Sequence, residues 1–215
     1  MSDFHTDAAT VPIRSGRPLL IVDADEVLLA FARGFDVFLG RHGCYLDLVS
    51  YRLHGNVRRR EGNDPLINIE VTALLDEFRT ELDWLEPIDG AVDALMSLRE
   101  HADVVILSNV TPEQAPARLR NLAALGLTVP LIANNGPKGP AVKTLAARAG
   151  ATAFFIDDIP MHHASVAELA PHVFRIHFAG DERLKPLMPP SEHAHLKAEN
   201  WNEIAAFVRA RLGDR

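Results

Sequence analysis

The stretch LLIVDADEV, residues 19–27, decides the fold, because four consecutive apolar residues run directly into Asp23 and Asp25. A short apolar, β-branched run that ends in polar residues is typical of a buried strand in a parallel sheet. Ligands of open α/β sheets bind beyond the carboxyl ends of such strands. Two carboxylates this close repel each other unless a cation or a shared proton lies between them. The stretch therefore predicts a strand that ends in a metal or proton site, with two helix-capping loop acids as the structural alternative.

Further apolar runs follow this strand and alternate with helical patterns along the second half of the chain. This alternation predicts a doubly wound, mainly parallel α/β sheet of the Rossmann-like type, covered by helices on both faces. The last helix is expected to start after Asn200, because Glu203 completes an Asn-x-x-Glu capping pattern. The other expected strands are 104–107, 129–133, 153–156 and 173–178, and the other expected helices are 91–100, about 115–125, 141–149 and 162–169.

About eighty residues separate the first two strands, far more than one crossover helix requires. Segments 31–39 and 69–85 show helical periodicity, so we expect a small inserted α-helical cap over residues 31–86. The core domain would then comprise residues 18–30 and 87–215. Residues 1–17 mix charged and small residues without an apolar run, and they are expected to form a flexible leader.

The composition narrows the classes of function. The 215 residues include 22 basic and 29 acidic side chains, a formal net charge of -7, which argues against a nucleic-acid partner. No apolar stretch is long enough to cross a bilayer, so no membrane partner is expected. The single cysteine, Cys44, is expected to be a small buried residue in a reducing, cytoplasmic protein.

Three later motifs also stand where expected strands end. Ser108 and Asn109 follow the second strand and offer a hydroxyl and backbone amides that suit phosphate oxygens. Lys138 precedes a helix among glycines, where a cation could neutralise a phosphoryl group. The pair Asp157-Asp158 leaves the fourth strand, and oxygen ligands without Cys or organised His favour Mg²⁺ over zinc. Each motif alone could also be purely structural, as a serine at a strand end, a solvated lysine or a pair of loop acids.

Two further features lie near these motifs. His162 and His163 follow the second acid pair and could be metal ligands, but histidines at the start of a surface helix are more often solvated. Lys143 falls inside the expected helix and is read as a solvated charge.

Taken in chain order, the motifs Asp23-x-Asp25-x-Val27, Ser108, Lys138 and Asp157-Asp158 resemble the four-motif signature of the haloacid dehalogenase-like superfamily. The inserted segment resembles that superfamily's cap between its first two motifs. The resemblance covers the chain from about residue 19 to residue 169.

The resemblance implies a role for each motif residue. Asp23 would be the nucleophile, Asp25 the general acid and base, Ser108 a phosphate-binding hydroxyl, and Lys138 the neutralising cation. Mg²⁺ would be held by Asp23, by the backbone carbonyl of Asp25 and by the acids of the fourth motif. Of these acids, Asp158 is the preferred direct ligand, with Asp157 nearby or acting through water.

These roles imply a phosphatase that hydrolyses a small phosphate monoester through an aspartyl phosphate. Dehalogenating relatives lack an acid at the position of Asp25, whereas a leaving alkoxide requires a proton. A phosphomutase or phosphotransferase and a catalytically silent phosphate-binding relative remain alternatives. A receiver domain fits less well, because acid pairs end both the first and the fourth strand.

The substrate is expected to be a small phosphorylated metabolite, and the protein a monomer or homodimer. Four arginines in the middle of the expected cap, with Arg58 and Arg59 as the preferred pair, could contact an anionic part of the substrate. A solvated face is the alternative. The four are Arg52, Arg58, Arg59 and Arg60.

Overall fold

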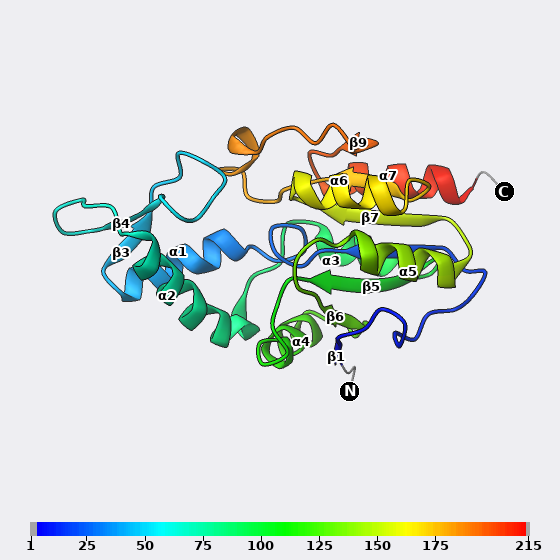
Figure 1. Ribbon diagram of the computed structural model, residues 1–215, viewed down its shortest axis with the longest axis horizontal. Coiled ribbons are helices and arrows are strands. Elements are labelled where there is room, and N and C mark those ends of the chain that lie inside the picture. The colour runs from blue at the N-terminus through cyan, green and yellow to red at the C-terminus, as the bar shows by residue number, and fades with distance from the viewer. Residues whose placement is uncertain (1–3, 214–215) are drawn as a thin grey trace.

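A computed structural model describes residues 4–213, and its central element is a seven-stranded sheet in which every neighbouring pair is parallel. The strand order is β1-β6-β5-β2-β7-β8-β9 (Figure 1). The expected α/β sheet and its five expected strands are confirmed, and two very short edge strands are added. The strands are β1 (Phe4–His5), β2 (Leu19–Val22), β5 (Asp103–Ser108), β6 (Leu131–Ala133), β7 (Ala153–Asp157), β8 (Phe174–His177) and β9 (Leu196–Lys197).

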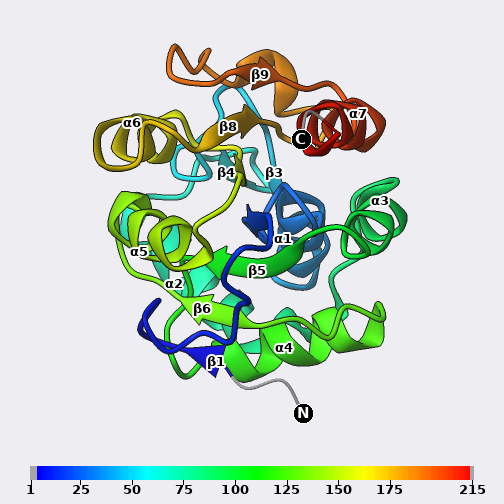
Figure 2. The ribbon, with the colours of Figure 1, turned by 90° about the vertical axis from the view of Figure 1, so that its right-hand side faces the viewer.

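Helices cover both faces of the sheet, as Figure 2 shows edge-on. On one face lie α5 (Gly139–Ala149) and α6 (Pro160–Leu169), and on the other lie α3 (Ala91–Leu98), α4 (Ala115–Ala124) and α7 (Trp201–Leu212). Side chains of strand β2 alternate between the two faces. Leu19 and Ile21 pack in the hydrophobic cluster on the side of α5 and α6, whereas Leu20 and Val22 pack in the cluster on the side of α3, α4 and α7. None of the described helices combines the length and apolar character needed to span a membrane.

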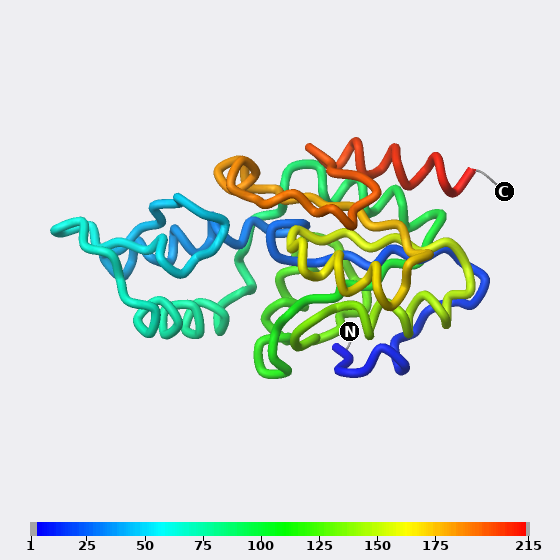
Figure 3. Tube along the Cα trace, turned by 45° about the horizontal axis from the view of Figure 1, so that its top comes forward, coloured from blue at the N-terminus to red at the C-terminus, as the bar shows by residue number. Residues whose placement is uncertain are grey.

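The insertion between β2 and β5 forms a separate lobe, visible at the left of Figures 1 and 3. The two expected helical segments are present, but a two-stranded antiparallel hairpin between them was not predicted. Its strands contain three residues each, too few for an alternating pattern to be recognised. The lobe comprises α1 (Phe31–Arg41), β3 (Cys44–Leu46), β4 (Val57–Arg59), α2 (Asn68–Phe78) and the 3₁₀ helix η1 (Arg79–Trp84).

Aromatic side chains hold the two helices of this lobe together. The ring of Phe78 lies 5.3 Å from that of Phe35 and 5.4 Å from that of Phe38, between ring centroids. At these separations each aromatic pair adds about 0.5–1.5 kcal/mol beyond the burial of its apolar area. Helix α1 also passes so close to Leu85 that a Cβ atom at Gly34 would collide with that leucine side chain. These aromatic residues of the lobe belong to the same hydrophobic cluster as Leu20 and Val22 of β2, so the core of the lobe is continuous with that of the sheet.

Two paired linkers join the lobe to the sheet domain. The backbone N–H of Ala30 donates to the carbonyl of Glu86 (2.9 Å), and that of Ile88 donates to the carbonyl of Leu28 (2.8 Å). The indole Nε1–H of Trp201, on α7, donates to the carbonyl of Val27 at 2.9 Å. These bonds fix the chain where it leaves β2, so the lobe is attached directly beside the end of the central strand.

The amino-terminal segment differs from its expectation. Residues 4–5 pair with β6 as an edge strand, and Val11 is completely buried against the α5 side of the sheet. The guanidinium of Arg14 pairs with Asp103 at the start of β5. The expected flexible leader is therefore wrong from Phe4 onward, because apolar contacts and an ion pair tie this segment to the core. Residues 1–3 of the expected leader lie outside the described residues.

Candidate active site

The acid-bearing ends of β2 and β7 lie side by side at the centre of the sheet. Val22 pairs with Ile156 on β7 and with Ile106 on β5, so Asp23 and Asp157 follow at the same level. The chain continues from β2 to one side, through β5 and β6, and then crosses to β7 on the other side. Such a switch point in an open α/β sheet opens a crevice at the carboxyl ends of the strands.

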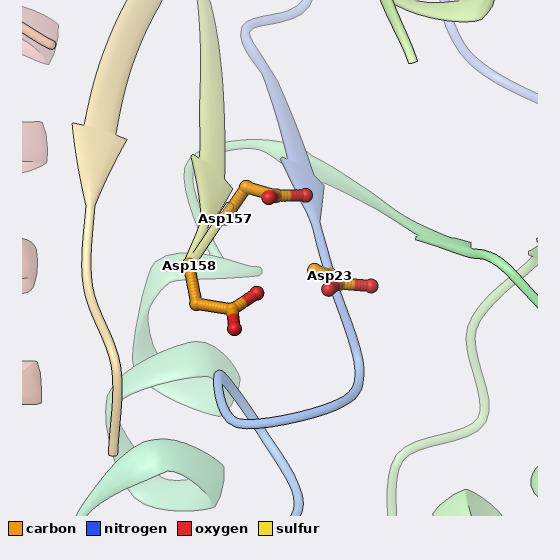
Figure 4. Close-up of side chains that lie close together, drawn as sticks. All are labelled: Asp23, Asp157 and Asp158. Carbon is orange, nitrogen blue, oxygen red and sulfur yellow. The ribbon is translucent and has the colours of Figure 1, made fainter. Parts of the chain in front are cut away.

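Three aspartates converge there, as Figure 4 shows. Asp23 follows β2, and Asp157 and Asp158 come from the end of β7. Each offers a carboxylate oxygen, and these oxygens all lie within 4.8 Å of one another. All three residues are buried, so their mutual repulsion is poorly screened by water. The structure thus brings together the three carboxylates that the sequence analysis assigned to a metal.

Lys138 supplies the nearest positive charge, and its side chain is almost completely buried. Its ammonium nitrogen lies 2.7 Å from Oδ1 of Asp23 and 2.6 Å from Oδ2 of Asp157. Residue 138 immediately precedes α5, so the loop after β6 delivers this lysine across the sheet end. The solvated alternative for Lys138 is excluded by this burial, whereas Lys143, one turn into α5, is exposed as expected.

The carboxylates are unequally compensated. Asp157 accepts from Lys138 through Oδ2 and from the backbone N–H of Ile159 through Oδ1 (2.8 Å). Burial raises the pKa of Asp157, but the charge of Lys138 outweighs it and the net pKa is lowered. The carboxylate of Asp158 accepts no hydrogen bond from the described residues, and burial together with the charges of Asp157 and Asp23 raises its pKa well above the ordinary value. Asp158 is therefore the least compensated of the three carboxyl groups.

Asp23 is held through one oxygen only. Its Oδ1 atom accepts from Lys138 and from the backbone N–H of Ala24 at 2.8 Å, whereas Oδ2 has no hydrogen-bond partner among residues 4–213. Burial raises the pKa of Asp23 to about 7, against the opposing charge of Lys138. Burial also acts against the charged form of Lys138, but Asp157 and Asp23 outweigh it, so the pKa of Lys138 is raised. Asp23 thus presents one oriented oxygen and one free oxygen.

Ser108 and Asn109 stand at the end of the neighbouring strand β5. Ser108 is completely buried, and its hydroxyl has no hydrogen-bond partner among the described residues. A buried hydroxyl without a partner is costly unless a ligand or water satisfies it. The side-chain amide of Asn109 donates to the carbonyl of Gly136 (3.2 Å), and its carbonyl accepts from Asn134 (2.7 Å). The strand end therefore carries an unused donor and an amide fixed by its neighbours.

Asp25 occupies the other side of the loop that leaves β2. One of its carboxylate oxygens, Oδ1, forms an ion pair with Nη2 of Arg118 on α4. The Arg118 side chain is completely buried, whereas that of Asp25 is 30% exposed. The side-chain cluster of potential metal ligands among the described residues does not include Asp25.

These residues open into one cavity of about 250 Å³ between the sheet and the inserted lobe. Its floor includes Asp23, Asp25, Asn109, Lys138 and Asp158. The lobe contributes apolar and aromatic side chains and one cation to the walls. These lobe residues are Phe31, Ala32, Tyr51, Leu53 and Arg79.

The structure does not bring Arg58 and Arg59 to this cavity. Arg58 lies on β4, and its Nε atom is 2.7 Å from Asp47 Oδ2. Arg59 Nη2 lies 2.5 Å from Glu70 Oε1 at the start of α2. Both charges are paired within the lobe, and neither residue lines the cavity, so their contact with the substrate stays a prediction. Arg79, which the sequence analysis missed, is the lobe arginine that lines the cavity.

His162 and His163 are both buried, which corrects the expectation that they are solvated. Nε2 of His163 lies 2.9 Å from the carbonyl oxygen of Asp157, and Nε2 of His177 lies 2.8 Å from that of Asp158. Burial lowers the pKa of His163 to about 4 and also lowers that of His177, so both rings are neutral near pH 7. His163 and His177 thus contact the backbone of Asp157 and Asp158. His162 lines the cavity.

Glu26 connects this site to the inserted lobe. Its Oε1 atom accepts from the backbone N–H of Ala32, near the start of α1, at 2.5 Å. Burial raises the pKa of Glu26 to about 8, and its backbone has a left-handed φ of 59°, a conformation that is uncommon outside glycine. No role for Glu26 was predicted from the sequence. In the structure its side chain links the loop after β2 to the start of α1 in the lobe.

No family model matches the sequence, and neither does any curated protein. Solved structures do match along almost the whole chain. A haloacid dehalogenase-like protein from Agrobacterium tumefaciens is 19% identical over 91% of this chain and 99% of its own, with a TM-score of 0.62. The chain has the haloacid dehalogenase-like fold.

Two other structures with this fold are similarly close. A haloacid dehalogenase family hydrolase from Deinococcus radiodurans, solved with bound phosphate and sodium, is 19% identical over 93% of this chain and 98% of its own (TM-score 0.59). An L-2-haloacid dehalogenase is 12% identical over 90% of this chain and 100% of its own (TM-score 0.60). At such identities the likeness establishes the shared fold, which the resemblance of the four motifs had predicted.

Proposed function

We propose that this haloacid dehalogenase-like protein is a Mg²⁺-dependent phosphatase that hydrolyses a small phosphate monoester through an aspartyl phosphate on Asp23. The observation that carries the proposal is the shared cavity of Asp23, Asp25 and Lys138, in which Oδ2 of Asp23 is free. A nucleophile, a proton carrier and a neutralising cation are the groups that such a reaction requires.

The residues present fit a divalent cation. Three buried carboxylates lie within 4.8 Å of one another, and Lys138 contacts only two of them. The donor set consists of oxygen atoms alone, which favours Mg²⁺ over softer metals. Asp23 and Asp158 would hold the ion directly, with Asp157 engaged by Lys138 and acting nearby. When bound, Mg²⁺ would offset the repulsion between the anionic nucleophile and the anionic ester.

The first half of the reaction transfers the phosphoryl group to the protein. Oδ2 of Asp23 attacks the phosphorus atom while Lys138 and Ala24 hold Oδ1. The bond from phosphorus to the ester oxygen breaks, and Asp25 donates a proton to that oxygen as it leaves as an alcohol. The hydroxyl of Ser108, which has no partner among the described residues, would donate to a phosphate oxygen at the neighbouring strand end.

The second half returns the enzyme to its starting state. Asp25, now ionised, accepts a proton from a water molecule, and the resulting oxygen nucleophile attacks the phosphorus of the aspartyl phosphate. The bond between phosphorus and the Asp23 oxygen breaks, which releases inorganic phosphate. Asp25 keeps the proton that it took from the water molecule and is thus ready for the next cycle.

Asp25 also distinguishes this proposal from dehalogenation, the activity named for one of the similar structures. A halide leaves as a stable anion and needs no proton, whereas an alkoxide does. The Asp25 side chain lines the cavity, so its carboxyl group can reach a leaving oxygen. The bound phosphate in the Deinococcus radiodurans protein also suits phosphate-ester chemistry at such a site.

We further propose a small phosphorylated metabolite as the substrate and no nucleic-acid or membrane partner. The cavity of about 250 Å³ suits a small ester, and the net charge of -7 repels polyanions. A cytoplasmic location agrees with the single, buried cysteine. The protein would act as a monomer or homodimer.

The direct test is phosphate release from p-nitrophenyl phosphate with and without Mg²⁺, followed by a screen of phosphorylated metabolites. We expect activity that depends on Mg²⁺ and is lost in Asp23→Asn while the circular dichroism spectrum is retained. Full activity in Asp23→Asn, or activity indifferent to chelator, would contradict the proposal. Product analysis separates a phosphatase from a mutase, because only the former releases inorganic phosphate stoichiometrically.

A further inference from the structure

Arg118 is a completely buried cation whose role the motifs do not explain. It lies on α4, and its Nη2 atom pairs with Oδ1 of Asp25. Its Nε and Nη1 atoms are buried without a hydrogen-bond partner among residues 4–213. Taking a guanidinium out of water is unfavourable unless its partners compensate for the lost hydration. Within the described part of the chain, Asp25 is its one ion-pair partner.

We infer that Arg118 is a positioning residue for Asp25, and this inference rests on the phosphatase function proposed above. Arg118 holds Oδ1 of Asp25 from the buried side of the loop, and Asp25 lines the cavity. The other carboxylate oxygen, Oδ2, is thereby directed to the open side as the atom that gives and takes the proton. Arg118 itself does not line the cavity and acts only through Asp25.

Helix α4 is anchored so that the guanidinium has a fixed position. Two residues beyond Arg118, Arg120 pairs with Asp83 of η1 at 3.0 Å. The side-chain amide of Asn121, also buried, donates to the carbonyl of Leu85 at 2.9 Å. Both contacts lie where the inserted lobe returns to the sheet. The cation that holds Asp25 is therefore carried by the same helix that fixes the end of the lobe.

A planar guanidinium suits this task better than an ammonium group. Its fixed donor geometry orients a carboxylate, whereas the lysine ammonium is a compact charge on a flexible stem. Misplacing a catalytic group by about 1 Å can reduce the rate about 100-fold. Replacing Arg118 should therefore impair the proton transfer that depends on Asp25 and leave the attack by Asp23 largely intact.

The need for this proton depends on the leaving group. A nitrophenolate is stable enough to leave unprotonated, whereas an unsubstituted phenolate is more basic and benefits from a proton donor. If Arg118 orients Asp25, its loss should reduce kcat/KM most for the most basic leaving groups. If Arg118 only supports the fold, all leaving groups should suffer equally.

The experiment measures kcat/KM with Mg²⁺ for a series of substituted phenyl phosphates, from p-nitrophenyl phosphate to phenyl phosphate. The variants are Arg118→Met and Arg118→Lys, with Lys143→Met, a change at an exposed cation of α5 that does not line the cavity, as the control. For Arg118→Met we expect a loss of about 100-fold on phenyl phosphate and under about 10-fold on p-nitrophenyl phosphate. Arg118→Lys should fall between this variant and the wild type, and Lys143→Met should follow the wild type.

Equal losses across the series, or no loss at all, would overturn the inference. If Arg118→Met fails to fold, Arg118→Lys is compared in the wild-type and Asp25→Asn backgrounds. Its effect on the leaving-group dependence should vanish when Asp25 is already neutralised, and a persistent effect would equally overturn the inference. A wild type that hydrolyses none of the esters would instead refute the proposed phosphatase function, which is a distinct outcome.

Discussion

The ammonium nitrogen of Lys138 lies 2.7 Å from Oδ1 of Asp23, and both side chains are buried. The same nitrogen lies 2.6 Å from Asp157. One cation therefore stands among three buried carboxylates that come from two strands. This arrangement makes the site electrostatically dependent on Lys138 whenever no metal is bound.

Replacing Lys138 by methionine should destabilise the metal-free protein by about 3–5 kcal/mol, because removing one partner leaves buried charges uncompensated. Urea unfolding in the presence of chelator measures this loss. Lys143→Met, an exposed lysine in the same helix, serves as the control and should change the free energy of unfolding by less than about 0.5 kcal/mol. Mg²⁺ should recover part of the stability of the Lys138 variant. An unchanged midpoint in Lys138→Met would show that the acids are compensated in another way.

Mg²⁺ should stabilise the wild-type protein against unfolding, and Asp158 should be required for this effect. A ligand at 100 times its dissociation constant adds about 2.7 kcal/mol to the free energy of unfolding. Without metal, Asp158→Asn should be at least as stable as the wild type. Burial and the charge of Asp157 raise the pKa of Asp158, so an ionised carboxylate is unfavourable at this position. Thermal melts with MgCl₂ and with NaCl of equal ionic strength separate binding from screening. An Asp158→Asn variant that still gains stability from Mg²⁺ would place the ion elsewhere.

Much of this site could be predicted from the sequence because its residues follow apolar strands. Asp23, Ser108 and Asp157 each end a strand that is recognisable from its composition, and the carboxyl ends of parallel strands share one edge of a sheet. Local patterns thus sufficed to place these groups together. The same logic placed Lys138, because its loop follows the strand next to β5.

Contacts between residues far apart in the chain could not be predicted in this way. Arg118 has the sequence context of an ordinary surface cation in an amphipathic helix, and its partner Asp25 lies 93 positions earlier. His177 sits at the end of a strand and supports Asp158 from 19 positions away. Strand β1 contains only two residues, so no periodicity could reveal it. These features depend on tertiary packing, which composition and spacing do not encode locally.

The ion pair of Asp103 with Arg14 should make stability depend on pH in acid. Burial raises the pKa of Asp103, but the hydrogen bonds and charge of Arg14 outweigh it, and the pKa is lowered from 3.8. A lowered pKa means that the ionised carboxylate stabilises the fold above about pH 4, and that this contribution is lost as pH falls through the folded pKa. Asp103→Asn should therefore cost about 1 kcal/mol at pH 7 and progressively less below pH 4.

Urea midpoints of the wild type and of Asp103→Asn between pH 3 and pH 7 measure this difference. Asp89→Asn, a change at an exposed acid for which the structure shows no ion pair within residues 4–213, provides the control. A difference that stays constant over this range would assign the loss to packing rather than to charge. No difference at any pH would mean that the segment around Arg14 contributes nothing to stability through this pair.

Arg79 should recognise an anionic group of the substrate beyond the transferred phosphate. It lines the cavity from the inserted lobe, and its one ion pair among the described residues is a 3.6 Å contact with Asp76. Its guanidinium is therefore available, whereas that of Arg58 is 2.7 Å from Asp47 and points to the hairpin. On the best substrate of a metabolite panel, Arg79→Gln should raise KM about 10-fold, equivalent to about 1.4 kcal/mol, with little change in kcat. Arg58→Gln should leave both constants near their wild-type values. Equal increases of KM in the two variants would point to a general disturbance of the lobe, and an unchanged KM in Arg79→Gln would show that the substrate does not reach this arginine.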